Sequence, residues 1–309
     1  MKLRLVFFGT PAFAVPFLRA LADDADVEVA AVVSQPDRPV GRKRLLEPTP
    51  TKAFAASRGL PVLQPAWLKA DETVSALRAL GADAFVIVAY GRIIPKSILE
   101  LPRLGCVNVH PSLLPRWRGP SPMPSEIAAG DVETGVSVML LDETMDTGPL
   151  LAVERIPVAP DETAPSLEAK VLAVGTPLLL KALKAYAAGK IKPVPQAADG
   201  ATVCKILARE DGKIDWTKSA AEIDRLRRAY QPWPGLWTTL DGVRVKILEI
   251  RSTDRRIDPG RLQVENRRLF VGTGSVALEL IRIQPEGAPV MDVPAFLNGR
   301  QNLNDKRFS

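Results

Sequence analysis

Asn108 and His110 are the residues of this chain whose types and spacing are best suited to chemistry. His110 is the only histidine among 309 residues, and Val107 and Val109 alternate with the pair, which predicts both polar side chains on one face of a strand. An amide and an imidazole can both donate hydrogen bonds to an oxygen that gains negative charge during acyl-group transfer. The pair therefore predicts an acyl-transfer site; a structural histidine at a strand end is the alternative.

The strand that carries this pair, expected over residues 106–110, should end at Pro111, because proline has no backbone N–H with which to continue a ladder. Asn108 and His110 then lie near the carboxyl end of their strand, the edge at which open α/β sheets bind ligands. Ser112 has no second histidine to activate it as a nucleophile, so we expect it to shape the pocket.

An acidic side chain is expected at the same edge of the sheet. A strand is predicted over residues 135–141, and its exit loop contains Asp142, Glu143 and Asp146. A carboxylate near an imidazole raises the pKa of the imidazole and fixes its tautomer. We favour Asp146 for this role, but spacing does not choose among the three acids, and each is compatible with a plain turn residue.

Composition narrows the class of protein. Hydrophobic residues at 46% and charged residues at 25% are ordinary for a soluble globular protein, and the length allows two domains. The two cysteines, Cys106 and Cys204, lie far apart and accompany a single histidine, which predicts neither a disulfide framework nor a zinc site. With too short an apolar run at the N-terminus for a signal peptide or a membrane span, the chain is expected in the cytoplasm.

Residues 1–189 predict an α/β fold, a Rossmann-like, mostly parallel sheet with helices on both faces. Apolar runs predict strands over residues 2–8, 27–33, 61–63, 84–90, 106–110, 135–141 and 150–157, and helical spacing predicts helices over residues 71–80 and 163–188. Gly9 is not followed by G-x-G-x-x-G, and no G-x-x-x-x-G-K-[ST] occurs, so neither nucleotide-binding fingerprint is present.

The segment 35–52 contains four prolines and five cationic side chains, and we predict a long irregular loop there. Arg38, Arg42, Lys43 and Arg44 are suited to contact phosphates. A solvated turn without function is the alternative.

Beyond residue 189 the pattern changes. Residues 190–204 predict a linker, and residues 205–309 predict one helix over 220–229 and short alternating runs separated by turns, which is typical of a small antiparallel barrel. Residues 201–309 hold 19 Lys and Arg against 14 Asp and Glu, a net charge of +5, whereas residues 1–200 hold 22 against 21, a net charge of +1. The basic excess indicates a polyanion such as nucleic acid; a solvated basic surface is the alternative.

Two motifs resemble the folate-dependent formyltransferase family: the N-x-H strand that opens Asn108–Gly119, and the D-x-G sequence that closes the loop 142–148. The resemblance implies Asn108, His110 and Asp146 as the catalytic residues. Four further regions are similar to family members that formylate a charged tRNA: residues 8–11, residues 35–42, residues 230–235, and the run 280–286 followed by 296–299. The resemblance thus covers essentially the whole chain.

The resemblance also implies the substrates: 10-formyltetrahydrofolate as co-substrate, initiator methionyl-tRNA as acceptor, and no metal. The implied folate-binding residues are Val88, Ala89, Tyr90, Gly91, Ser112, Leu113, Leu114, Pro115, Leu141 and Asp142. The implied tRNA-binding residues are Arg38, Arg42, Lys43 and Arg44, together with an OB-like barrel over residues 205–309. We expect a monomer.

In the implied mechanism the α-amine of methionyl-tRNA attacks the formyl carbon, Asn108 and protonated His110 hold the oxyanion, and Asp146 supports the imidazolium. The alternatives are a sugar-nucleotide N-formyltransferase, a non-catalytic RNA-binding protein and a formyl-folate hydrolase. Two prolines that depart from the family pattern, Pro120 and Pro124, are expected to shorten or delay the helix that follows.

Overall fold

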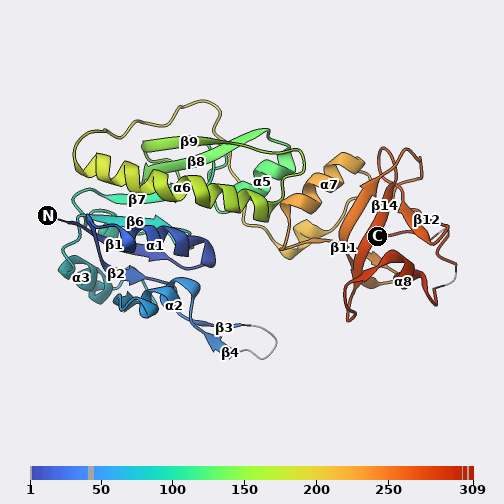
Figure 1. The fold of residues 1–309 in the computed structure, drawn as a ribbon, viewed down its shortest axis with the longest axis horizontal. Helices are drawn as coiled ribbons and strands as arrows, with labels where there is room; N and C mark the ends of the chain where they lie inside the picture. Colours follow the sequence, from blue (N-terminus) through green and yellow to red (C-terminus); the bar gives the residue numbers. More distant parts are fainter. Residues whose placement is uncertain (1, 41–44, 301, 305) are drawn as a thin grey trace. The chain divides into compact units, whose positions relative to one another are not determined.

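The computed structural model describes residues 2–40, 45–300, 302–304 and 306–309 (Figure 1). Contacts divide the chain into two compact units. The N-terminal unit comprises Met1–Pro122, Glu133–Pro157 and Glu168–Lys205, and the C-terminal unit comprises Met123–Val132, Val158–Leu167 and Ile206–Ser309. Within the described ranges, the helices are too short or too polar to cross a membrane.

The N-terminal unit is built on a seven-stranded sheet with the strand order β5-β2-β1-β6-β7-β8-β9. The strands are β1 (Leu3–Gly9), β2 (Val27–Val33), β5 (Val62–Leu63), β6 (Ala84–Val88), β7 (Cys106–His110), β8 (Glu133–Leu140) and β9 (Leu150–Pro157). Pairing is parallel from β5 to β7, whereas β8 is antiparallel to both of its neighbours. The predicted mostly parallel sheet is confirmed.

Helices cover both faces of this sheet (Figure 1). They are α1 (Val15–Asp23), α2 (Pro50–Ser57), α3 (Asp71–Ala79), α4 (Lys96–Leu99) and α6 (Ala164–Ala187), with a 3-10 turn at Ala12–Ala14. Leu77 of α3 and Ile98 of α4 share a buried cluster with Phe8 of β1. On the opposite face, Gly175 of α6 lies where an added Cβ would be 3.2 Å from Val136 of β8, so the helix packs closely there.

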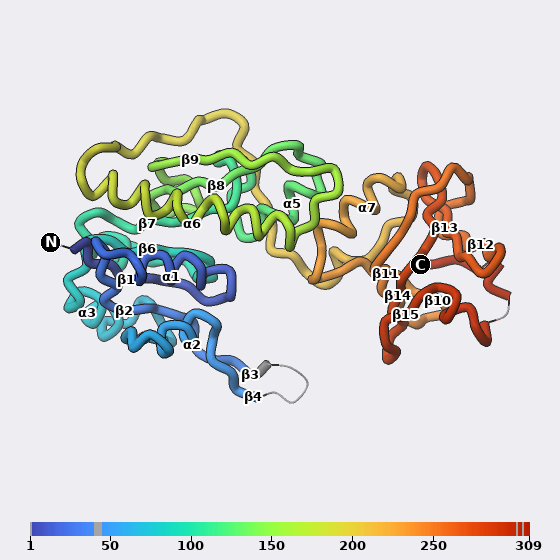
Figure 2. Tube along the Cα trace, viewed as in Figure 1, coloured from blue at the N-terminus to red at the C-terminus, as the bar shows by residue number. Residues whose placement is uncertain are grey.

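The segment 35–52 is more regular than we predicted. Strands β3 (Arg38–Val40) and β4 (Leu45–Glu47) pair as an antiparallel hairpin, which Figure 2 shows extending away from the sheet, and α2 begins at Pro50. At the root of the hairpin, the Asp37 carboxylate accepts hydrogen bonds from Lys52 Nζ at 2.5 Å and Gln64 Nε2 at 2.7 Å. The prediction of a loop without regular structure was therefore wrong.

The helix after the β7 loop is α5 (Pro122–Ala129), which begins only two residues after Pro120 and takes Pro124 into its first turn. Because the first helical N–H groups have no partner within the helix, a proline at such a position removes no helical hydrogen bond. The expected delay of this helix is therefore small.

The C-terminal unit contains an antiparallel sheet with the order β10-β11-β14-β13-β12, and β15 pairs with β14. The strands are β10 (Leu236–Leu240), β11 (Val243–Ser252), β12 (Leu262–Glu265), β13 (Arg268–Val271), β14 (Leu278–Pro285) and β15 (Met291–Asp292). The predicted helix is α7 (Ala220–Ala229), but α8 (Val293–Leu297) and a 3-10 turn at Arg209–Gly212 also occur, so the prediction of a single helix was wrong.

The chain terminus links the two edge strands of this sheet. Thr239 of β10 exchanges backbone hydrogen bonds with Ser309, and the N–H of Leu262 in β12 donates to the carbonyl of Lys306. Trp216 and Phe308 stack with their ring centroids 5.6 Å apart in the buried core. The chain terminus is thus hydrogen-bonded to both edge strands, and the antiparallel β-rich C-terminal domain predicted from the sequence is confirmed.

Candidate active site

Asn108 and His110 lie where the sequence predicts, at the carboxyl end of β7, which stops before Pro111. Asn108 pairs with Ile87 of β6, and Ile87 pairs with Phe8 of β1, so the two polar side chains share the sheet face that α3 and α4 cover. The exposed fractions are 9% for Asn108 and 4% for His110. Both side chains are therefore largely shielded from water.

The two ring nitrogens of His110 face different partners. Nε2 lies 2.8 Å from the carbonyl oxygen of Trp117, and Nδ1 lies 3.7 Å from Oδ2 of Asp146. A carbonyl oxygen only accepts hydrogen bonds, so Nε2 must carry the hydrogen. In the neutral ring, Nδ1 then presents a lone pair beside the Asp146 carboxylate.

Burial lowers the pKa of His110, and it outweighs the Asp146 carboxylate and the Trp117 carbonyl, which both raise that pKa. Burial therefore favours the neutral imidazole, and the protonated His110 that the resemblance implies for the tetrahedral intermediate stays a prediction. A neutral Nδ1 beside a carboxylate is suited to accept a proton from a nucleophile, since the resulting imidazolium meets a negative charge on one side and a carbonyl on the other.

In the structure the three acids of the loop 142–148 have different partners. The Asp142 carboxylate accepts hydrogen bonds from Thr144 and Thr147 at 2.8–2.9 Å; burial raises its pKa, but these bonds outweigh burial and lower it. Glu143 pairs with Lys96 at 2.7 Å. Asp146 is the acid brought to His110, and its Oδ2 also accepts a hydrogen bond from the N–H of Gly119 at 2.8 Å.

The loop 111–119 folds over His110 because its own polar groups are satisfied internally. Ser112 is fully buried and its hydroxyl donates to the carbonyl of Arg116 at 2.7 Å, while Ser137 of β8 accepts from the N–H of Leu114 and donates to the carbonyl of Ser112. The Ser112 hydroxyl thus helps to hold the conformation of this loop through its hydrogen bond to Arg116. In this loop conformation the Trp117 carbonyl lies against the His110 ring.

Gly135 allows β8 and β9 to approach this loop. A Cβ at Gly135 would lie 2.2 Å from the Glu154 carbonyl and 2.4 Å from the Leu113 side chain, so only glycine fits. The sequence prediction did not single out this residue. Gly135 was the first residue of the strand predicted over 135–141, but it lies inside the observed β8, where a glycine indicates a close approach.

The predicted folate positions 88–91 lie at the end of β6 and just beyond it. Val88 and Tyr90 are buried, and the Tyr90 ring packs edge-on against Phe8 at a centroid distance of 5.5 Å. Ala89 and Gly91 are exposed and have positive φ values of 46° and 79°. Both residues are therefore accessible just beyond the end of β6.

A cavity of about 450 Å³ opens beside the same sheet edge, and it contains the predicted positions Leu141 and Asp142. Its other lining residues are Lys96, Leu99, Glu100, Glu143 and Thr144. Leu141 also packs against the buried cluster that contains Ile87, so it joins the cavity to the sheet. The hydrogen-bonded Asp142 and the exposed Lys96–Glu143 ion pair make this cavity polar and charged.

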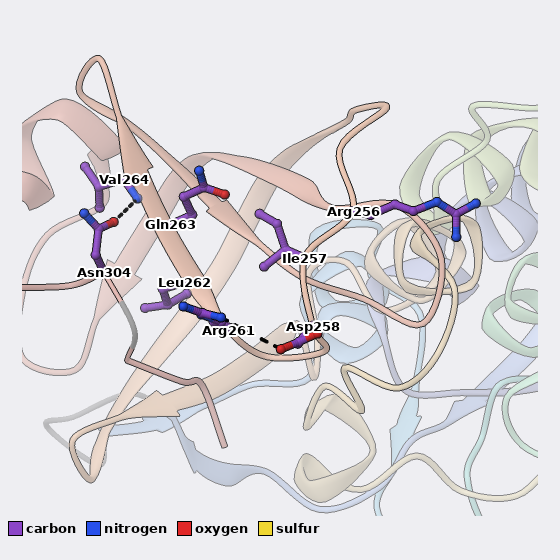
Figure 3. A pocket seen from close by; sticks show the side chains of 8 residues that line it. All are labelled: Arg256, Ile257, Asp258, Arg261, Leu262, Gln263, Val264 and Asn304. Carbon is purple, nitrogen blue, oxygen red and sulfur yellow. Dashed lines mark hydrogen bonds and ion pairs between the residues drawn. The ribbon is translucent and has the colours of Figure 1, made fainter.

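The C-terminal unit has a cavity of about 440 Å³, and its lining lacks the residues proposed for acyl transfer (Figure 3). It is lined by Arg256, Ile257, Asp258, Arg261, Leu262, Gln263, Val264 and Asn304. Figure 3 shows Asp258 turned toward Arg261, and Asp258 Oδ2 lies 3.9 Å from Arg261 Nη1. Asn304 Oδ1 accepts a hydrogen bond from the N–H of Val264 at 2.6 Å. No histidine lines it, since His110 is the only one in the chain.

Of the predicted tRNA-binding residues, Arg38 lies exposed on β3, where its guanidinium donates to Gln35 Oε1 at 3.0 Å. Arg42, Lys43 and Arg44 lie outside the described residues.

The chain matches the family described as "Formyl transferase" over residues 1–183 and the family described as "Formyl transferase, C-terminal domain" over residues 206–301. The first match alone covers more than half of the chain, so the fold and the site define a formyl transferase. The "Methionyl-tRNA formyltransferase" of Myxococcus xanthus (strain DK1622) is 46% identical over 299 residues, which are 96% of this chain and 95% of that protein. The chain belongs to the methionyl-tRNA formyltransferase family.

More distant solved structures share the fold. HypX from Aquifex aeolicus superimposes with a TM-score of 0.68 at 18% identity, covering 98% of this chain and 49% of that one. The N-formyltransferase from Helicobacter canadensis, solved with folinic acid and dTDP-3-aminofucose, gives a TM-score of 0.64 at 18% identity and covers 91% of this chain and 98% of that one. At such low identity the likeness supports the architecture alone.

Proposed function

We propose that this chain transfers the formyl group of 10-formyltetrahydrofolate to the α-amino group of initiator methionyl-tRNA. The observation that carries the proposal is the approach of His110 Nδ1 to within 3.7 Å of the Asp146 carboxylate, beside Asn108, in a chain 46% identical to a methionyl-tRNA formyltransferase. We further propose that the chain acts as a cytoplasmic monomer and uses no metal.

In the proposed mechanism the neutral α-amine forms a bond to the formyl carbon, and the amide of Asn108 donates a hydrogen bond to the oxygen that becomes negative. His110 accepts the amine proton at Nδ1, and Asp146 and the Trp117 carbonyl stabilise the imidazolium. The imidazolium, which now also supports the oxyanion, returns the proton to the leaving nitrogen as the bond from that nitrogen to the formyl carbon breaks.

We propose the folate site at the carboxyl ends of β6 and β7. The backbone of Ala89 and Gly91 is open to a ligand, and Leu141 and Asp142 line the cavity beside it. Val88, Tyr90, Ser112, Leu113, Leu114 and Pro115 form the walls that hold these groups in place. The polar backbone groups and apolar walls suit a flat heterocycle with amide-like edges.

For the acceptor, we propose that the β3–β4 hairpin, with Arg38, Arg42, Lys43 and Arg44, contacts the phosphates at the acceptor end of the tRNA. The barrel over residues 205–309 contributes further contacts, supported by the net charge of +5 over residues 201–309. Residues 1–189 then form the catalytic domain, and residues 190–204 connect it to the barrel.

A formylation assay tests the function directly. The full-length protein is mixed with 10-formyltetrahydrofolate and either charged initiator tRNA or an amino-sugar nucleotide, and the products are identified by mass spectrometry. We expect formylmethionyl-tRNA, formed with a steep dependence of KM on salt because a polyanion releases many counterions. Formylation of the sugar nucleotide alone would overturn the proposal, and so would formate release without transfer.

A further inference from the structure

We propose that Gln196, in the segment that leaves α6, is a positioning residue that holds the Asp146 loop against His110. The inference rests on the proposed function and extends it. Gln196 lies 50 positions from Asp146 in sequence, and nothing in its residue type or neighbours predicted a role. The contacts of its side-chain amide carry the proposal.

The amide of Gln196 uses both of its ends. Nε2 donates to the backbone carbonyls of Asp146 and Gly148, each at 2.8 Å. Oε1 accepts from the guanidinium of Arg118, at 2.8 Å from Nη2 and 3.2 Å from Nε. One half-buried side chain therefore ties the D-x-G loop to the loop that covers His110.

The backbone on either side of Gln196 is also fixed to the N-terminal unit. Val194 exchanges two backbone hydrogen bonds with Leu150, the first residue of β9, at 2.7 and 2.8 Å. Leu150 follows the Asp146 loop directly, so this pairing brings Gln196 to the loop in a fixed register. Gln196 is therefore positioned by a strand edge.

Further along the same segment, residues 202–204 pair with the loop that covers His110. The N–H of Arg118 donates to the Thr202 carbonyl at 2.9 Å, and the N–H of Cys204 donates to the Arg118 carbonyl at 2.8 Å. The N–H of Trp117 donates to Thr202 Oγ1 at 2.8 Å. Gly119 makes this approach possible, since a Cβ there would lie 2.5 Å from the Cys204 carbonyl.

The segment 194–204 thus has two anchors, one for each partner of the His110 ring. Gln196 holds the backbone of Asp146, whose carboxylate faces Nδ1, and residues 202–204 hold the backbone around Trp117, whose carbonyl meets Nε2. A carboxylate displaced by about 1 Å can cost on the order of 100-fold in rate. The inferred role of Gln196 is to prevent that displacement.

The test replaces Gln196 by methionine, which keeps the volume and adds no charge but removes every hydrogen bond. We expect kcat for formyl transfer to fall roughly 10- to 100-fold, while KM for either substrate changes less than about 3-fold, because the binding surfaces remain. Gln284→Met is the matched control: Gln284 is also half-buried and donates to a backbone carbonyl, that of Ala288 at 3.1 Å, but in the C-terminal unit.

A second readout needs no activity and is specific for Asp146. His110 is the only histidine, so histidine-labelled full-length protein gives one pair of ring ¹⁵N signals to follow against pH. Asp146 raises the pKa of His110. We therefore expect the His110 titration to move to lower pH in Gln196→Met and to stay unchanged in Gln284→Met. A merely structural loss of stability would not move it in the folded protein.

An active Gln196→Met enzyme with wild-type kcat and an unmoved His110 titration would overturn the inference and leave the proposed function intact. Conversely, a wild-type protein that forms no formylmethionyl-tRNA would overturn the function, and the titration would still test the contact. If Gln196→Met fails to fold, Arg118→Met is the second variant, because it removes only the hydrogen bonds to Gln196 Oε1. We expect its His110 titration to move in the same direction by a smaller amount. A folded Arg118→Met protein with an unmoved titration would count against the inference.

Discussion

The end of β7 and the β3–β4 hairpin hold polar side chains in opposite ways. At the end of β7, Asn108 and His110 are buried, and each ring nitrogen of His110 has a defined partner. On the hairpin, Arg38, Leu45 and Leu46 are exposed, and Asp37 holds the root through Lys52 and Gln64. The difference separates chemistry, which needs groups fixed before the substrate arrives, from recognition, which needs charge that reaches outward.

The largest effect is expected at the buried site. His110→Ala should lower kcat on the order of 100- to 10,000-fold, since proton transfer by a positioned side chain contributes that much. Single-turnover formylation with excess enzyme measures it without interference from product release. Equal binding of charged tRNA by the variant and the wild type is the control, and a variant that turns over near the wild-type rate would place the proton transfer elsewhere.

The buried site should also set the pH dependence. Because burial lowers the pKa of His110, and the neutral ring accepts the proton, activity should fall as pH drops through a midpoint below 6.5. Asp146 raises that pKa, so Asp146→Asn should move the midpoint of its residual activity still lower. A kcat profile from pH 4.5 to 8 on both proteins measures this, and a midpoint above 6.5 would mean that the ring is charged at rest.

A smaller and different effect is expected on the hairpin. Arg38→Ala should raise KM for tRNA a few-fold and reduce the slope of log KM against log salt by about 1, with little change in single-turnover rate at saturating tRNA. Arg78→Ala on α3, an exposed arginine outside the hairpin and the barrel, is the comparison for general charge loss. If Arg38→Ala instead lowered the saturated rate as His110→Ala does, the separation between the two regions would fail.

The strand carrying the proposed catalytic pair could be predicted because its sequence signals are local. Alternation places Asn108 and His110 on one face, and Pro111 ends the strand. The lowered pKa of His110 could not be predicted, because it depends on burial of the ring under the loop 111–119. Spacing alone did not choose Asp146 among the three acids of its loop, although the resemblance implied it. In the structure Thr144 and Thr147 hydrogen-bond to the Asp142 carboxylate, and Asp146 is the acid that lies near His110.

The hairpin and the role of Gln196 escaped prediction for different reasons. Pro39 argues against a strand in a sheet interior, but β3 has only β4 as a partner, and an edge tolerates proline. Gln196 lies in a proline-containing segment that is typical of a linker, and its partners are backbone carbonyls distant in sequence. Backbone partners leave no sequence signature.

The central claim is that Asp146, among the three acids of its loop, works with His110 in formyl transfer. Single-turnover formylation of initiator methionyl-tRNA at saturating 10-formyltetrahydrofolate, by Asp146→Ala and by Glu143→Gln, tests it most directly. Glu143 is the control because it pairs with Lys96 at the surface, and saturation removes any effect of its place in the cavity wall. We predict a loss on the order of 100-fold or more for Asp146→Ala and a rate within about 2-fold of wild type for Glu143→Gln. A wild-type rate in Asp146→Ala would contradict the account.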